Sequence, residues 1–167
     1  MKIKNEKDYS DEQKKWKFKK SGTFQLKSPN AVKYLYFPLI NEAGMKSSIT
    51  PNLQGDAKID QNTFLLSPCT VEDLHISNDG RNFWLKFDNE EVWSVSGNSV
   101  KQKVNCFSNQ KDEVYVEIGF LWHRLIRKNK KLGIKAVTTN FVPVDNRTVE
   151  LMEVQITNIS NDIIKFT

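Results

Sequence analysis

The sequence contains few of the residues on which metal-binding, redox and many catalytic sites depend. Among its 167 residues there are two cysteines, Cys69 and Cys106, and two histidines, His75 and His123. The cysteines lie in no CxxC-type spacing, so neither a zinc site nor a dithiol redox motif is expected. Because the sequence shows no secretory segment, we expect both thiols to be reduced and unpaired.

Long apolar runs are absent as well. No stretch approaches the roughly 18 consecutive apolar residues that indicate a membrane-spanning helix. We therefore expect a cytoplasmic protein with no membrane partner. The sequence also lacks an internal repeat and a sustained hydrophobic period of 3.6 residues, so helices are expected to be short at most.

Excess positive charge is nearly confined to the beginning of the chain. The formal net charge is +5, and residues 1–20 hold eight lysines against four acidic residues. That segment therefore accounts for almost all of the excess. A solvated, lysine-rich edge explains it better than a polyanion site does, because lysines protect exposed strand edges from pairing with other chains. We expect no nucleic-acid partner.

The sequence is rich in aromatic residues and in segments where apolar and polar residues alternate strictly. It holds 10 Phe, 4 Trp and 4 Tyr, and aromatic and β-branched residues favour pleated, half-buried surfaces. Alternating segments predict eight strands. They are Lys15–Lys19, Thr23–Lys27, Val32–Phe37, Asn82–Phe87, Val92–Ser96, Glu113–Arg127, Leu132–Val144 and Thr148–Ser160. The predicted fold is an all-β, antiparallel β-sandwich.

The predicted domain organisation of the chain has two parts. Residues 1–22 form a lysine-rich segment with the first strand, and residues 23–167 form the sandwich. Glu113–Arg127 is predicted to be one long strand, with Val114 and Trp122 on the same face. Phe37–Pro68, which has three prolines and two glycines, is predicted to be a long loop. The final strands have apolar faces that need a covering layer, so we expect the chain to be part of a larger sandwich.

Known catalytic patterns are missing. There is no Gly-x-Ser-x-Gly motif, and Gly44–Ser47 lacks the glycine pattern of a phosphate loop. His123 lies inside a predicted strand, where a structural role is favoured. His75 has only Glu72 and Asp73 nearby in the sequence, so no metal ion is expected. Acidic residues between positions 42 and 73 could form a carboxylate pair, but solvated loop acids explain them better.

A polar and aromatic region between Asn41 and Trp84 is the best candidate binding region. Amides, carboxylates and aromatic faces are the groups that bind sugars. An ordinary surface loop would have a similar composition, and that alternative stays open. The candidate substrate-binding or interface residues are Asn41, Glu42, Gln61, Asp73, His75, Arg81, Asn82 and Trp84.

A string of segments across residues 32–167 resembles a known family. The segments are Phe37–Met45, Ser47–Pro51, Gly55–Asp56, Gln61–Leu66, Glu72–His75, Arg81–Trp84, Gly119–His123, Phe141–Val144 and Val149–Met152. Together they resemble the N-terminal region of cellobiose-phosphorylase-like enzymes. These form glycoside hydrolase family 94 and its sister β-glucan phosphorylase families, formerly glycosyltransferase family 36.

The resemblance implies an N-terminal supersandwich, similar to galactose-mutarotase folds, followed by a catalytic (α/α)₆ barrel. Such enzymes cleave a β-linked glucooligosaccharide with inorganic phosphate, which is a co-substrate, and release α-glucose 1-phosphate with inversion. They need no cofactor. The barrel supplies the general-acid aspartate, and no part of residues 1–167 matches it, so no catalytic residue is assigned here.

The resemblance therefore implies a domain that is inactive alone and that contributes to active-site closure and to contacts in a homodimer. A free-standing carbohydrate-binding or assembly module is the alternative. A mutarotase-like epimerase is a weaker one, because its histidine and carboxylate arrangement is not evident.

Overall fold

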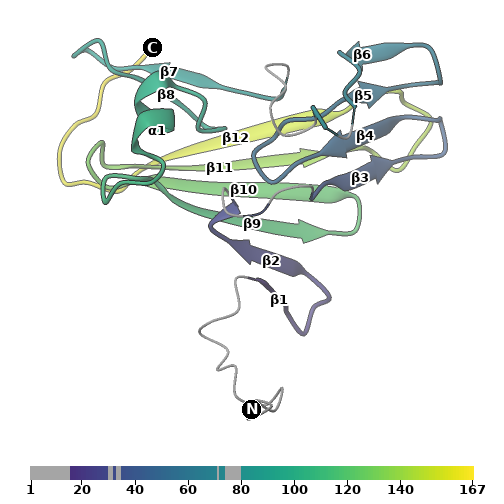
Figure 1. The fold of residues 1–167 in the computed structure, drawn as a ribbon, viewed down its shortest axis with the longest axis horizontal. Coiled ribbons are helices and arrows are strands. Elements are labelled where there is room, and N and C mark those ends of the chain that lie inside the picture. Colours follow the sequence, from purple (N-terminus) through teal and green to yellow (C-terminus); the bar gives the residue numbers. More distant parts are fainter. Residues whose placement is uncertain (1–15, 30–31, 33–34, 71, 74–79) are drawn as a thin grey trace, which may run out of the picture.

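A computed structural model describes residues 16–29, 32, 35–70, 72–73 and 80–167 (Figure 1). These residues form twelve strands and one helix, α1 (Val100–Asn105). Every strand pairing is antiparallel. The prediction of an all-β, antiparallel sandwich is confirmed. No helix in the described ranges is long and apolar enough to cross a membrane.

The larger sheet has six strands in the order β1-β2-β9-β10-β11-β12. Their bounds are β1 Trp16–Phe18, β2 Phe24–Lys27, β9 Glu113–Gly119, β10 Trp122–Asn129, β11 Ile134–Phe141 and β12 Leu151–Asn158. The last four strands form a meander, and β2 joins it by pairing with β9. Residues that are about 90 positions apart in the sequence are thus neighbours in this sheet.

The second layer is built from smaller elements. A four-stranded sheet contains β3 (Phe37–Ile40), β4 (Lys46–Ile49), β5 (Ala57–Lys58) and β6 (Phe64–Leu66), in that order. A separate hairpin pairs β7 (Trp84–Lys86) with β8 (Val92–Ser94) and is followed by α1. Figure 1 shows the four-stranded sheet at one end of the large sheet and the hairpin with α1 at the other.

The expected long loop over Phe37–Pro68 is wrong, because this segment is the four-stranded sheet. Its turns are closed by local hydrogen bonds to side chains, which compensate for the few backbone hydrogen bonds between such short strands. The Asn41 Oδ1 accepts from the Met45 amide at 3.1 Å, and Gly44 adopts a φ of 89° in the same turn. The Asp60 carboxylate accepts from two backbone amides in the β5–β6 turn. Strands this short contain too few residues for an alternation of apolar and polar side chains to be recognised in the sequence.

Glu113–Arg127 is not one strand. The chain turns at Phe120 and Leu121, and Trp122 pairs with Gly119, so β9 and β10 form a two-residue hairpin. Val114, Val116 and Ile118 share the buried face as predicted, whereas Trp122 lies on the opposite face and Phe120 is 89% exposed at the turn.

The other predicted strands lie close to observed ones. The exception is Val32–Phe37, since the strand found here begins at Phe37 and Val32 and Leu35 are not in a strand. Lys33 and Tyr34 of that prediction lie outside the described residues. Turns that include Lys20–Gly22 and Asn89–Glu91 connect β1 with β2 and β7 with β8.

The core lies between the large sheet and the second layer. Its main cluster joins alternate residues of β2, β9, β10 and β11 to the β7–β8 region, with Trp93 1% exposed. A smaller cluster joins the four-stranded sheet to Val142. On β9–β11 the other alternating set of residues stays partly exposed. One face of the large sheet is therefore covered, and no described element covers the other.

Candidate functional site

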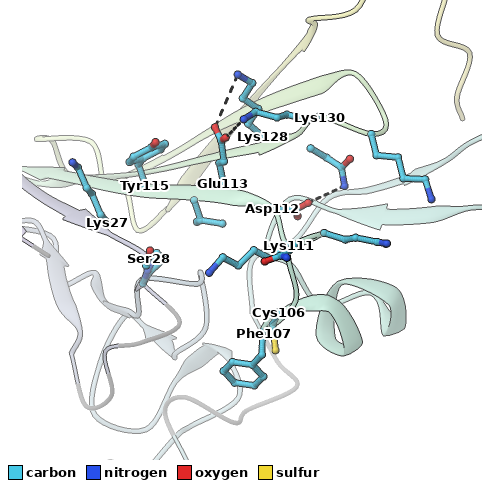
Figure 2. Close-up of a pocket in the computed structure, with 16 residues that line it drawn as sticks. Lys27, Ser28, Cys106, Phe107, Lys111, Asp112, Glu113, Tyr115, Lys128 and Lys130 are labelled. Carbon is cyan, nitrogen blue, oxygen red and sulfur yellow. Dashed lines mark hydrogen bonds and ion pairs between the residues drawn. The ribbon is translucent and has the colours of Figure 1, made fainter.

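A cleft of about 670 Å³ opens where the end of β2, the start of β9 and the end of β10 meet (Figure 2). We call it the lysine cleft. Its lining residues are Lys27, Ser28, Pro29, Cys106, Phe107, Asn109, Gln110, Lys111, Asp112, Glu113, Val114, Tyr115, Lys128, Asn129, Lys130 and Lys131. Five lysines therefore line it against two carboxylates.

The Asp112 carboxylate is used within the protein. Its side chain is 5% exposed and pairs with Arg127 at 3.2 Å. It also accepts hydrogen bonds from Asn129 at 2.8 Å, Gln102 at 2.7 Å and Trp93 at 3.2 Å. Such a buried charge is stable only when it is paired and hydrogen-bonded. Asp112 thus joins β8, α1 and β10 below the cleft, and its charge is already compensated.

Arg127 is held just as firmly. Its guanidinium donates to the Val95 and Ser96 carbonyls, both at 2.9 Å. Burial lowers the pKa of Arg127, while the Asp112 carboxylate opposes that shift. A Cβ at Gly97 would lie 2.5 Å from the guanidinium, and the φ of Gly97 is 85°. Glycine is therefore needed there for both space and backbone conformation.

The Glu113 carboxylate is compensated by two lysines of the cleft. Figure 2 shows Lys128 and Lys130 both directed at it, and the Lys128 ion pair measures 4.0 Å. The hydrogen bond from Lys130 lowers the pKa of Glu113, and the same bond raises the pKa of Lys130. Both groups are therefore charged at neutral pH.

Lys27, Lys111 and Lys131 remain without an acidic partner among the described residues. With both acids of the cleft compensated, these three lysines give it a net positive charge. Phe107 is 92% exposed and Tyr115 is half-buried, so aromatic rings also line the cleft. This combination is suited to binding an anion that has an apolar part.

A second polar cluster is buried between the large sheet and the four-stranded sheet. The Arg81 Nη2 donates to Glu150 Oε2 at 2.7 Å and to the Asp56 carbonyl at 3.1 Å, and its Nη1 donates to the Gly55 carbonyl at 3.2 Å. Ser47 donates to the same carboxylate. The side chains of Arg81 and Glu150 are 5% and 10% exposed. This arrangement connects β4, the β4–β5 loop and the segment before β12.

His123 lies beside this cluster, fully buried on β10 and paired with Asn140 on β11. Burial lowers its pKa to about 3, with a further contribution from the positive charge of Arg81. Its imidazole is therefore neutral at ordinary pH. Both ring nitrogens are buried without a hydrogen-bond partner, as is the Thr138 hydroxyl on the next strand. The sequence predicted a structural role inside a strand for His123, but on the face opposite Val114; the turn at Phe120 and Leu121 puts it on the buried face instead.

The candidate residues of the polar region are not brought together in the lysine cleft. The Asn41 amide donates to the Pro143 and Arg147 carbonyls and tethers the β3–β4 turn. Glu42 and Gln61 are exposed in turns. Asp73 is exposed and accepts from the Thr70 hydroxyl at 2.8 Å.

The remaining candidates have different positions. His75 lies outside the described residues. Arg81 is buried in the cluster with Glu150, whereas the Asn82 Oδ1 accepts from the Phe83 and Ser96 amides. Trp84 is 48% exposed on β7. Asn41 and Arg81 thus act as structural ties, and Trp84 presents an aromatic surface.

The lysine cleft was not predicted. Residues 128–131 lie between two predicted strands, and Lys111 and Asp112 precede the first of them. The available signal was two charged segments flanking one hairpin, Lys111–Glu113 and Lys128–Lys131, which the register brings together. Lys27 joins them through the β2–β9 pairing, which alternation alone does not reveal.

Among the described residues, no group of three or more His, Cys, Asp or Glu side chains is placed to hold a metal ion, and Cys69 and Cys106 are free thiols. In comparisons with known proteins, no family model matches the chain and no curated protein gives a significant match.

Proposed function

We propose that this chain is the N-terminal β-sandwich of an inverting β-glucoside phosphorylase. The parent enzyme converts a β-linked glucooligosaccharide and inorganic phosphate into α-glucose 1-phosphate, with its general-acid aspartate on an (α/α)₆ barrel. The chain alone is not catalytic. Its roles are active-site closure and contacts within a homodimer, in the cytoplasm, and its fold belongs with the supersandwiches.

One observation carries this proposal: separate pieces of the family-like string meet in one network. Arg81 contacts Glu150, Ser47 and the carbonyls of Gly55 and Asp56, which come from three other pieces of the string. The meeting of these pieces in one buried cluster supports the interpretation that the whole string belongs to one fold.

A second contact of the same kind lies nearby. The Asn41 amide, in the first piece of the string, donates to the Pro143 carbonyl at 3.1 Å, in a piece 102 residues later. Both contacts tie the four-stranded sheet to the segment between β11 and β12. The family-like residues thus serve the architecture, which fits a domain that supports catalysis elsewhere.

The charges of the chain also fit a non-catalytic role. A general acid needs a carboxyl group whose pKa is raised, so that it holds a proton near neutral pH. Among the described residues, the carboxyl groups with shifted pKa values are Asp60, Glu113 and Asp145, and all three pKa values are lowered. The causes are the Asn62 amide for Asp60, Lys130 for Glu113 and Arg147 for Asp145.

The uncovered face of the large sheet offers a surface for a neighbouring domain. Trp122 lies over Gly119, where an added Cβ would come within 2.2 Å of the indole ring. The Arg124 guanidinium lies 5.0 Å from the centre of that ring, a cation–π distance. Flat aromatic and arginine surfaces of this kind are common at protein interfaces.

The test combines the purified chain with the (α/α)₆ barrel of a β-glucoside phosphorylase from which its own sandwich has been removed. We expect the chain to bind the barrel in size-exclusion chromatography and to increase release of α-glucose 1-phosphate from β-glucooligosaccharides and phosphate. Adding back the barrel's own sandwich is the control for a competent barrel. The chain without a barrel should release none.

Two results would contradict the proposal. One is release of α-glucose 1-phosphate by the chain alone at an ordinary enzymatic rate. The other is failure to bind a barrel that its own sandwich does activate. Calorimetry of the isolated chain with glucooligosaccharides distinguishes the alternative, since tight binding without a barrel would favour a free-standing carbohydrate-binding module.

A further inference from the structure

In the described part of the chain, β12 is the longest strand that lies at the edge of a sheet. We propose that its free edge accepts a further β-strand, an extended segment of another polypeptide in which apolar and polar side chains alternate as they do in β12. The apolar side chains of this donor strand face the core. The edge lies apart from the face offered to the barrel, and the inference does not depend on the proposed function.

The backbone of β12 has an unused row of hydrogen-bonding groups. β12 pairs with β11 on one side, and no described strand pairs with the other side. The Ile159 amide donates to the Gly133 carbonyl at 2.7 Å in the same register. Because bonded pairs alternate along an antiparallel ladder, the amides and carbonyls of Met152, Val154 and Ile156 point away from β11. These groups have no backbone partner among the described residues, so a further strand can bond them.

The core is open at the same edge. The residues of β11 on the covered face are at most 1% exposed, and they are Ala136, Thr138 and Asn140. Their partners across the ladder on β12 are Ile156, Val154 and Met152. These three side chains are only partly buried, although two of them already pack against the main core cluster. A donor strand with apolar side chains on this face would continue the core beyond β12.

β12 also lacks the features with which proteins protect an exposed edge. Protected edges are usually short, or they carry lysine, proline or a bulge. The opposite edge of the large sheet follows this rule, since β1 has three residues with Lys17 at its centre. β12 has eight residues, no lysine, no proline and an uninterrupted register with β11. Extended peptides add to exposed edges of this kind.

The second layer indicates which occupant fits the edge. Figure 1 shows β6 and β7 reaching past β12 on the side of its free edge. A single strand that adds to β12 would lie beneath these elements. A second intact copy paired through β12 would bring its own second layer to the same side of the sheet, because the two-fold axis between the strands is perpendicular to the sheet. The two layers would then compete for one space, which favours a single extended segment.

The sequence of β12 supplies a probe, because its pattern is self-complementary. In an antiparallel pairing centred on Val154, Met152 of one strand lies opposite Ile156 of the other, on the covered face. Glu153 lies opposite Gln155 on the other face, so no like charges meet. A peptide with the sequence of β12, capped at both ends, therefore has the alternation that the donor strand requires.

Hydrogen exchange of the full chain, followed by ¹H–¹⁵N NMR, measures the state of the edge directly. In the free chain, the amides of Met152, Val154 and Ile156 should exchange fast. The amides of Glu153 and Gln155, which bond β11, should exchange slowly. Saturating peptide should slow the first set at least about tenfold and leave the second set nearly unchanged. A peptide of the same composition with its apolar residues consecutive is the control, and it should not bind.

Matched changes test the hydrogen bonds and the apolar row. N-methylation of the peptide at the positions of Val154 and Ile156 removes donors that face the chain, and should weaken binding at least about tenfold. N-methylation at the positions of Glu153 and Gln155 adds the same groups on the far edge and should leave binding nearly unchanged. In the chain, Met152→Lys puts a charge in the apolar row and should weaken binding, whereas Gln155→Lys puts it on the other face and should not. Both side chains contact solvent, so both variants should fold.

Several results would overturn the proposal. One is no saturable binding of the peptide, and another is equal binding of the control with consecutive apolar residues. Equal weakening by the two methylated peptides would show that the contact is not the free edge. Slow exchange of the Met152, Val154 and Ile156 amides in the free chain at every protein concentration would mean that the edge is already paired. Slow exchange that appears only as the concentration rises would assign the edge to a second copy instead.

Discussion

Arg81 is a charged side chain at a position where an isolated charge would be very unfavourable. It is stable there because Glu150 pairs with it and because two backbone carbonyls and Ser47 accept its remaining protons. Removing two charges from water costs several kcal/mol for each ion, and only good geometry offsets that cost. The pair therefore adds specificity more than net stability: it fixes how the two layers meet.

The first prediction concerns the loss of this arginine. Arg81→Met should lower the free energy of unfolding by about 3–5 kcal/mol, because it leaves the Glu150 carboxylate buried without a counter-charge. Urea denaturation followed by circular dichroism measures the change. Arg147→Met is the matched control, since Arg147 pairs with Asp145 at the surface and should matter much less. Equal effects of the two variants would contradict the structural role assigned to Arg81.

His123 gives the second prediction, on pH. Its pKa is lowered from 6.5 to about 3 by burial and by Arg81. The unfolded state therefore binds this proton between those two values while the folded state does not. Stability from this group is complete above pH 6.5 and is lost as the pH falls towards 3, by about 1.4 kcal/mol per pH unit.

The measurement compares wild type with His123→Leu by urea denaturation at pH 7 and pH 4.5. Carboxylates titrate equally in both proteins, so the difference isolates His123. We expect the wild type to lose about 2–3 kcal/mol more than the variant over this interval. Identical pH dependence in the two proteins would show that His123 is not held neutral in the core.

The sequence predicted a structural role in a strand for His123, but neither the burial of His123 nor the role of Arg81. Alternation through one unbroken strand placed His123 on the face opposite Val114, whereas the two-residue turn brings His123 to the buried face. Arg81 was a candidate sugar-binding or interface residue because it lies in a polar region. Its partner Glu150 is 69 residues away, and the pairing depends on how two layers pack. Nothing in the local sequence around Arg81 indicates that pairing.

At the level of elements, the β9–β10 hairpin explains both a success and an error. Alternation in residues 113–119 and 122–129 predicted extended chain correctly. The turn was missed because Phe120-Leu121 contains none of the Asn-Gly or Asp-Gly signals of a two-residue hairpin. Leu121 nevertheless adopts a φ of 59°, a conformation rare for leucine. The long ladders on both sides of the turn hold it there.

The same elements show why the four-stranded sheet was missed. Its strands have two to four residues, and β5 pairs with β6 through an irregular register. Alternation over so few residues cannot be distinguished from a loop rich in proline and glycine. The sheet forms because its turns are closed by side-chain bonds and because Leu39, Ile49 and Met45 pack against Val142.

The third prediction tests how the hairpin places its aromatic residue. Gly119→Ala puts a Cβ within 2.2 Å of the Trp122 indole, so the ring must leave its position over β9. We expect a stability loss of about 1–3 kcal/mol, typical of overpacking. We also expect a shift of the indole N–H resonance of Trp122. Phe120→Ala is the control, because Phe120 is 89% exposed. An unchanged resonance in Gly119→Ala would contradict the packing described here.

At the scale of the whole molecule, the two faces of the large sheet differ in kind. The covered face buries His123, Leu125 and Arg127 on β10, whereas the intervening residues of that strand remain partly exposed. The uncovered face is not uniformly polar, since Ile126 and Val137 pair across β10 and β11 at its centre. An apolar centre within a charged surround is the composition of an interface.

The fourth prediction follows from that asymmetry and from the proposed function. Replacing Ile126 and Val137 by Lys should change the stability of the isolated chain little, because both side chains already contact solvent. Binding to the (α/α)₆ barrel should fall at least about tenfold, because two charges would be buried at the interface. Size-exclusion chromatography and calorimetry measure the two effects.

The matched control for this variant replaces Ile40 and Leu65 by Lys. These side chains are 49% and 51% exposed on the four-stranded sheet, so the chemical change is the same on another surface. If the barrel binds through the uncovered face, only the first variant loses affinity. Equal loss in both would mean that added charge, not this face, determines binding. Unchanged affinity in both would place the interface on some other surface of the sandwich.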